Sequence, residues 1–359
     1  MIDNSKSIEN DDSMQETSKK RYVKYLFNFA IFFALIYLTF RILLKDQNMD
    51  ELANTITSAK LHYILLGVLC MIVFYVCESF NMRRTLRALG EKCNMLTAIK
   101  YTLIGAFFSA ITPAASGGQP MQIFFMHRDG IKVSSSTISL LLNLMSFQTI
   151  TIVLELVSAC FLHEYMDAGV KIIFVIGVIL NFSSLVLIIV GMTSKKLSNA
   201  LVKFVAKVLK FFKVKNYEKK EQSMNEALEM YNESAKYIRG NKTILFKQFS
   251  VGIFQQIVYY SIPFFVVLAL GLPRQSYILT VALQSMVFGS VSGIPSPGAV
   301  GVSEGAFVEI FRNIYPEHMI KSATLLNRGI NFYIFMLISG ILVAVNQFRE
   351  KKNVEEAAV

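Results

Sequence analysis

The sequence predicts an all-α polytopic membrane protein, built as an inverted repeat of two four-element halves with six full spans and two re-entrant helical hairpins. Three observations carry this prediction. Of the 359 residues, 53% are hydrophobic and 17% are charged, and the mean hydropathy is +0.47, which is typical of chains that cross a bilayer. Apolar stretches of about 20 residues, the length that spans the hydrocarbon core, recur along the chain. Two further apolar stretches are broken by proline and glycine at corresponding places in the two halves.

Six stretches have the length and composition of full membrane spans. They cover residues 25–44, 62–80, 135–162, 169–191, 244–270 and 321–347. The two broken stretches, 97–127 and 276–314, are each long enough for two short spans or for one re-entrant hairpin.

The positions of lysine and arginine favour re-entrant hairpins, because basic residues gather on the cytoplasmic side of membrane proteins. Basic clusters at 19–24, 83–87 and 349–352 place both termini and the end of the second span inside. Arg128 and Lys132, after the first broken stretch, then also lie inside, so this stretch enters and leaves from the cytoplasm. The second broken stretch enters and leaves from outside. This opposite orientation predicts the inverted repeat, with ordinary paired short spans as the alternative.

The chain is therefore expected to divide into a few segments. Residues 1–18 are polar and acidic and predict a disordered cytoplasmic tail. The first membrane half covers 19–162 and the second 163–347, which includes a cytoplasmic basic amphipathic insertion at 195–243. Residues 348–359 form a second cytoplasmic tail.

The insertion begins with a basic amphipathic pattern. Lys203, Lys207 and Lys210 repeat at helical spacing, which predicts a helix lying on anionic lipid of the inner leaflet. The expected partner of the basic residues that give the net charge of +11 is thus anionic lipid and not nucleic acid. A second helical stripe is expected to pack on the cytoplasmic face or on a partner, or to belong to a solvated tether: Met224, Leu228, Tyr231, Ala235 and Ile238.

The first broken stretch predicts a binding site for an anion. Its candidate residues are Pro113, Gly117, Gly118, Gln119, Pro120 and Arg128. Proline is favoured in the first turn of a helix, so a short helix from about 120 to 128 would point its N-terminus toward the middle of the membrane. Free amides and the helix dipole at such an end attract an anion, including a lipid phosphate.

The second broken stretch repeats this logic. Its candidate residues are Pro295, Pro297, Gly298, Gly301 and Glu304, with Arg328 from the last span. A short helix is expected to begin near Val302. Glu304, in its first turn, is expected to cap that helix, to pair with Arg328 or a cationic headgroup, or to carry a coupling proton.

Other polar residues in the spans carry weaker expectations. Glu78 is expected to be structural, near Arg83 and Arg84, and Arg328 could neutralise either Glu304 or Glu155. Five amides are expected to bond between helices more than to line a cavity: Asn143, Gln148, Gln255, Gln256 and Gln284. We predict no catalytic residue, cofactor or metal site, since the four cysteines lack metal-type spacing and no phosphate-binding loop or zinc motif occurs.

The two broken motifs, TPAASGGQP at 112–120 and IPSPGAVGVSE at 294–304, resemble the membrane region of the lysylphosphatidylglycerol synthase/flippase family. The resemblance extends over about residues 20–348. It implies a multi-pass protein of the bacterial cell membrane that moves aminoacylated phosphatidylglycerol outward, a step that gives resistance to cationic antibiotic peptides. Bifunctional members carry a further cytoplasmic transferase domain that makes this lipid. The chain ends at Val359, so we expect the transferase domain, and the lysyltransferase activity, to be absent.

The function expected from residues and resemblance together is a flippase-like translocation of an anionic or aminoacylated phospholipid, or of a related glycolipid. Three alternatives stay open: a membrane-embedded lipid-modifying transferase, a flippase for polyprenyl-phosphate-linked sugars, and a scaffold docked through 195–243. The sequence also leaves homo-oligomerisation open.

Overall fold

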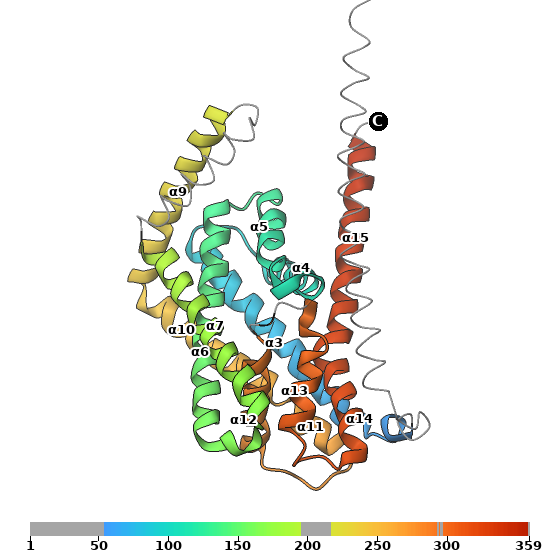
Figure 1. Ribbon diagram of the computed structural model, residues 1–359. Helices are drawn as coiled ribbons and strands as arrows, with labels where there is room; N and C mark the ends of the chain where they lie inside the picture. The colour runs from blue at the N-terminus through green and yellow to red at the C-terminus, as the bar shows by residue number, and fades with distance from the viewer. Residues whose placement is uncertain (1–53, 195–216, 293, 295–296, 358–359) are drawn as a thin grey trace, which may run out of the picture.

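The computed structural model describes residues 54–194, 217–292, 294 and 297–357. Every regular element in this part of the chain is a helix, and no strand occurs in it (Figure 1). This confirms the all-α prediction. The expected tail at 1–18 and the first expected span at 25–44 lie outside the described residues.

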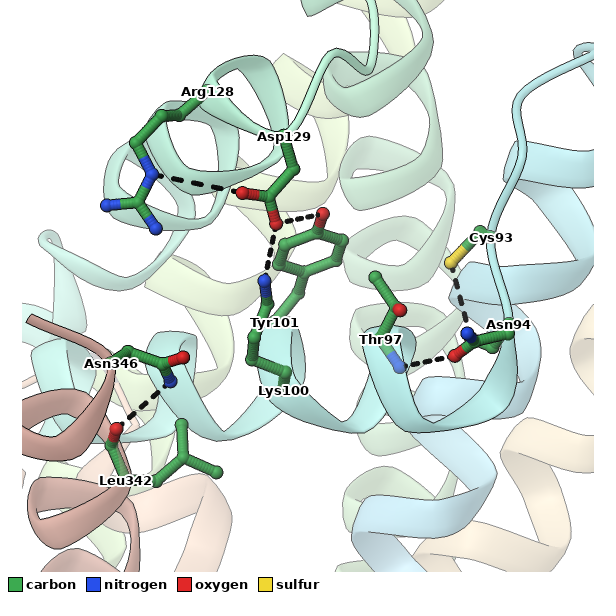
Figure 2. A network of polar contacts seen from close by, with 9 residues as sticks. All are labelled: Cys93, Asn94, Thr97, Lys100, Tyr101, Arg128, Asp129, Leu342 and Asn346. Carbon is green, nitrogen blue, oxygen red and sulfur yellow. Dashed lines mark hydrogen bonds and ion pairs between the residues drawn. The ribbon is translucent and has the colours of Figure 1, made fainter. Parts of the chain in front are cut away.

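The described part of the first half, together with the turn that follows it, contains four helices and two short turns of 3₁₀-helix. They are α3 (Leu61–Ala88), α4 (Met95–Ile111), η1 (Pro113–Ala115), α5 (Gly118–Arg128), α6 (Val133–Leu162) and η2 (His163–Tyr165). Helix α4 begins at a side-chain cap, because the Asn94 carboxamide accepts a hydrogen bond from the Thr97 amide at 2.8 Å (Figure 2). Such a cap satisfies one of the free amides of the first turn.

The second half contains more elements because its spans are interrupted. They are α7 (Ala168–Thr193), α9 (Tyr217–Gly240), α10 (Lys242–Tyr260), α11 (Ile262–Ala269), α12 (Tyr277–Val291), η3 (Pro297–Ala299), α13 (Val302–Ile310), α14 (Glu317–Arg328), η4 (Gly329–Tyr333) and α15 (Ile334–Ala357). Element η4 is a turn of π-helix that joins α14 to α15.

Five helical segments of the described chain are long and apolar enough to cross a membrane. They cover Leu61–Ala88, Val133–Tyr165, Ala168–Thr193, Lys242–Ala269 and Glu317–Asn346. They match five of the six spans expected from the sequence. Helix α7 has large apolar side chains on most of its surface, and Ile172 and Leu187 are 63% and 67% exposed. In a membrane such side chains face lipid.

Both broken stretches form helical hairpins. Helices α4 and α5 pack against each other, as do α12 and α13. In Figure 1, α5 and its loop lie toward the end of the bundle opposite to the loops that flank α12 and α13. The hairpin tips η1 and η3 contact each other inside the bundle. This arrangement agrees with hairpins that enter from two sides, and the repeat symmetry itself stays a prediction.

Each hairpin packs into its own hydrophobic core. The core of the first hairpin includes the fully buried Tyr101, Phe125 and Met126, together with residues of α3. The core of the second includes Phe307 and Phe311, whose rings stack at 4.4 Å. The two hairpins are therefore anchored in separate apolar clusters, and they meet at their tips.

Helix α9 packs on the membrane bundle and is not a solvated tether. Ala235 and Ile238 are buried in a cluster with residues of α6 and α7, and the Tyr231 hydroxyl donates to the Gly191 carbonyl of α7 at 2.9 Å. The C-terminal part of the expected stripe therefore packs on the protein itself. Lys203, Lys207 and Lys210 lie outside the described residues.

The open end of the first hairpin is closed by a polar cluster around Asp129 (Figure 2). Its carboxylate accepts a hydrogen bond from the Tyr101 hydroxyl at 2.7 Å and forms ion pairs with Lys100 and Arg128. Lys100 and Tyr101 belong to α4, whereas Asp129 caps the end of α5. Burial alone would raise the pKa of the Asp129 carboxyl, but the donors Lys100 and Tyr101 and the nearby positive charges lower it below its ordinary value of 3.8.

We expect the Asp129→Asn variant to lower the free energy of unfolding by about 1 kcal/mol, because the amide loses the ion pairs and the charge-assisted hydrogen bond. Thermal unfolding in detergent micelles measures this. The Asp129 pKa is lower in the folded state, so its contribution is present at neutral pH and disappears as the pH falls through that lowered pKa.

The matched control is Asp167→Asn. The Asp167 carboxylate caps α7 by accepting from the Val170 amide at 2.7 Å, and asparagine caps a helix as well as aspartate does. Equal destabilisation by both variants at neutral pH would contradict the assigned role of the Asp129 cluster.

Candidate functional site

The two hairpin tips share an unusual backbone conformation. Ala115 in η1 has φ 53° and Ala299 in η3 has φ 52°. Both angles lie in the left-handed region, which costs a residue other than glycine about 1 kcal/mol. Both alanines are the last residue of their 3₁₀ turn. This shared conformation supports the prediction from the sequence that the two tips occupy equivalent places in the two halves.

A buried ion pair holds the tip of the second hairpin. The Glu304 carboxylate accepts from the Arg328 Nε atom at 2.8 Å and from the backbone amide of Gly301 at 2.7 Å. The Arg328 Nη2 atom also donates to the Gly298 carbonyl at 2.9 Å. Glu304 and Arg328 are 1% and 6% exposed. Glu304 therefore both caps its own helix and pairs with Arg328, so two of the roles considered for it are combined.

The glycines of the first tip allow close packing. A Cβ atom on Gly118 would lie 2.1 Å from the Ser109 hydroxyl oxygen and 2.9 Å from the Gly105 carbonyl of α4. The Gly117 amide donates to the Thr112 hydroxyl at 2.9 Å. These two positions bring α5 against α4. Helix α5 begins at Gly118 and not at Pro120, which falls in the first turn, where a missing amide costs no helical hydrogen bond.

A cavity of about 380 Å³ lies beside both tips. It is bounded by residues of α3, α4, α5, α6, α10 and α15 as well as by the tips and η4. Among the expected site residues, Gln119 and Gly298 line it, and so does the strained Ala115. Glu304 and Arg328 lie behind Gly298 and shape the wall without lining it.

The walls of the cavity combine aromatic rings with amides. The aromatic residues are Phe74, Tyr75, Phe147 and Phe332, and the amide side chains are Gln119, Gln122, Asn143, Gln248, Gln255 and Asn331. None of the described residues that line it is a lysine, arginine or histidine. Such a surface offers hydrogen bonds and aromatic faces but no positive charge.

Several of these amides are held in place by neighbours. The Gln248 Nε2 atom donates to Asn143 Oδ1 at 2.7 Å and to the Ser146 hydroxyl at 3.0 Å. Gln122 donates to the Tyr101 carbonyl at 3.1 Å. The Asn331 Oδ1 atom, in contrast, is buried without a hydrogen-bond partner in the described part of the chain. The cavity thus has a fixed polar wall with at least one unused acceptor.

Glu78 is the acidic residue of the cavity, and the sequence interpretation had treated it as structural. It comes from α3 and lines the cavity, and no hydrogen bond or ion pair of its carboxylate occurs among the described residues. Arg84 forms no ion pair with it, and the Arg84 guanidinium donates instead to Asn81 at 2.5 Å and to Gln248 at 3.4 Å. The sequence signal that could have placed Glu78 in a cavity is the presence of an acidic residue within an apolar span.

The five amides noted in the sequence have different surroundings. Asn143 and Gln255 line the cavity, and Asn143 also accepts a hydrogen bond between helices from Gln248 of α10 at 2.7 Å. Gln148 donates to Asn181 at 2.9 Å and Gln256 to the Thr151 hydroxyl at 2.9 Å, so they connect helices, whereas the Gln284 Oε1 atom is buried without a partner among the described atoms. The expectation of hydrogen bonds between helices therefore holds for only part of the set.

The remaining expected site residues lie away from the cavity. Arg128 is at the far end of α5 and stacks on the Phe125 ring at 4.3 Å. Pro113 and Pro120 are exposed beside the first tip, and Gly301 begins α13 at φ 88°. Pro295 lies outside the described residues, and Pro297 opens η3. No group of metal-ligating side chains is present in the described ranges.

We expect Arg328→Gln to lower the free energy of unfolding by about 3–5 kcal/mol, because it leaves the Glu304 carboxylate buried without its counter-charge. Thermal unfolding in detergent measures the loss. The double variant Glu304→Gln/Arg328→Met removes both charges and should recover most of it.

The control is Arg312→Gln, since Arg312 pairs with Glu309 at 2.5 Å but is half exposed. Exposed pairs contribute about 0–1 kcal/mol. A loss for Arg328→Gln no larger than that for Arg312→Gln would show that the buried pair does not hold the tip.

The comparisons with known proteins agree with this architecture. The chain is 22% identical over 317 residues to a UPF0104 membrane protein of Archaeoglobus fulgidus, covering 86% of this chain and 94% of that protein. It is 22% identical over 320 residues to a UPF0104 membrane protein of Pyrococcus horikoshii, covering 85% and 93%.

Residues 25–339 match the family described as the lysylphosphatidylglycerol synthase TM region. This match includes both hairpins, their tips and the cavity between them. Because it covers most of the chain, the protein belongs to the lysylphosphatidylglycerol synthase TM region family.

Proposed function

We propose that this protein is a flippase-like translocator that moves a lipid with a polar headgroup between the two leaflets. The observation that carries the proposal is a cavity within the helical bundle, lined by amide, acidic and aromatic side chains and bounded by two broken hairpin tips. Non-helical backbone at membrane depth is tolerated where it lines such a cavity, and paired broken helices mark the substrate sites of transporters.

The wall chemistry suggests which part of the lipid enters. A carboxylate without a cation, amide groups and aromatic faces together suit an ammonium group, because aromatic rings and carboxylates both attract cations. We therefore place the amino group of an aminoacylated phospholipid beside Glu78, with its phosphate toward the N-terminus of α5 at Gly118–Gln119. At the second tip the Gly301 amide already bonds to the Glu304 carboxylate. A sugar headgroup would use the amides and leave Glu78 without a counter-charge.

Alternating access would come from the two hairpins. In this proposal they are related by the inverted repeat of 19–162 and 163–347, with both termini in the cytoplasm of a bacterial cell, and each hairpin opens the cavity toward one leaflet. The contact between η1 and η3 supports a shared gate. Arg128, at the open end of the first hairpin, and Lys203, Lys207 and Lys210 would contact anionic lipid of the inner leaflet.

The test is reconstitution into liposomes with a panel of fluorescent lipids that carry ammonium, glycerol or sugar headgroups. We expect Glu78→Gln to slow translocation of the ammonium lipid by at least about tenfold, equivalent to about 1.4 kcal/mol, with less effect on the others. Glu78 has no other partner in the described chain, so folding should be unaffected.

The control variant is Glu164→Gln, whose side chain is exposed in η2. Equal rates for wild type and Glu78→Gln with every headgroup, at equal protein abundance, would refute the assignment of Glu78. A chemically altered lipid recovered from the vesicles would instead favour the transferase alternative.

A further inference from the structure

Glu155 is a second acidic residue inside the membrane bundle, and it does not line the lipid cavity. It belongs to α6 and is 0% exposed. Its carboxyl group lies against the backbone of α12, since a Cβ atom on Gly289 would be 2.7 Å from the Glu155 Cδ atom. The sequence left Arg328 as a possible counter-ion for this group, but Arg328 pairs with Glu304.

The surroundings of Glu155 do not supply a positive charge. Its Oε1 atom accepts a long hydrogen bond of 3.4 Å from the Asn181 Nδ2 atom, and its Oε2 atom is buried without a partner in the described part of the chain. Among the described residues, the titratable neighbour that interacts with it is Tyr260 of α10, and no lysine, arginine or histidine pairs with it. A buried carboxylate without a counter-ion is far more costly than a buried neutral acid.

Asn181 connects this carboxyl group to the tip of the second hairpin. The Asn181 Nδ2 atom also donates to the Ser292 hydroxyl at 2.6 Å, and Asn181 Oδ1 accepts from Gln148 at 2.9 Å. Ser292 is the C-cap residue of α12, at the end of that helix nearest the tip. One shared amide therefore connects Glu155 to the end of α12 from which the second hairpin turns.

The carboxyl group is closed off by a tight contact between helices. A Cβ atom on Gly177 of α7 would lie 1.9 Å from the Gly289 carbonyl oxygen of α12, so the two backbones touch beside Glu155. The carboxyl group is 0% exposed, and a displacement of α12 from α6 and α7 would open this contact. The geometry therefore offers a link between exchange of a proton and movement of the second hairpin.

We propose that Glu155 is an occluded proton-binding site, and that uptake and release of its proton accompany movement of the second hairpin. On uptake, a proton from water adds to the carboxylate and gives the neutral acid, and on release the proton returns to water. No other bond changes. The proton site stands independently, whereas its coupling to lipid movement rests on the proposed function.

The proton site is tested by infrared spectroscopy of the purified protein in a detergent without ester groups, because the C=O stretching band of a protonated carboxyl group lies at higher frequency than the bands of carboxylates and amides. At neutral pH we expect wild type to show such a band and Glu155→Gln to lose it, while the exposed control Glu164→Gln keeps it. Glutamine keeps the shape of the side chain and the acceptor for Asn181. Identical spectra for wild type and Glu155→Gln would overturn the proposal.

The coupling is tested in proteoliposomes with an imposed pH gradient. We expect the gradient to change the lipid translocation rate of wild type severalfold, and Glu155→Gln to lose this dependence while its rate without a gradient persists. Ser292→Ala should keep the infrared band but weaken the gradient dependence. A gradient response retained in Glu155→Gln would refute the coupling. If wild type moves no lipid at all, the proposed function fails, and the infrared band still decides the proton site.

Discussion

The structure depends on one constraint: where a helix is interrupted inside a membrane, the free backbone amides and carbonyls need hydrogen-bond partners. Four helices stop partway through the bundle, at Ile111, Gly118, Val291 and Val302, and the amides and carbonyls at those ends cannot turn to water. Side chains meet part of this need, and the two tips lie in contact with each other. The Gly298 carbonyl bonds to Arg328 and the Gly301 amide to Glu304, so the buried ion pair serves the backbone as much as it balances charge.

The two hairpins satisfy the same requirement in different ways. The first uses small residues, with Gly117 and Gly118 set closely against α4, and it is fastened at its open end by the Asp129 cluster. The second is fastened at its tip by Glu304 and Arg328. The first hairpin is thus fastened by an ion-pair cluster at its open end and the second by an ion pair at its tip. The two gates of a translocator built on this plan would therefore have different mechanics.

The sequence predicted where the helices lie along the chain, but it did not predict which side chains of different helices meet. Hydrophobic length located five described spans, and the proline and glycine positions located both tips, with α13 beginning at Val302 as expected. The place of Glu78 in the cavity wall was not predicted, because its nearest basic neighbours along the chain, Arg83 and Arg84, suggested pairing. Which residues share a cavity depends on how α3, α6 and α10 cross, and periodicity within one helix does not contain that information.

The π-helical turn at Gly329–Tyr333 has a consequence for how the last span evolves. A π turn holds one residue more than an α turn, and each residue of an α-helix advances the helix by about 100°. Loss of one residue here would rotate α14 against α15, so that Arg328 and Phe332 no longer meet the second tip from the same side. Insertions and deletions should thus be excluded from this short segment more strictly than substitutions, which makes its length, and not its composition, the trait that selection preserves.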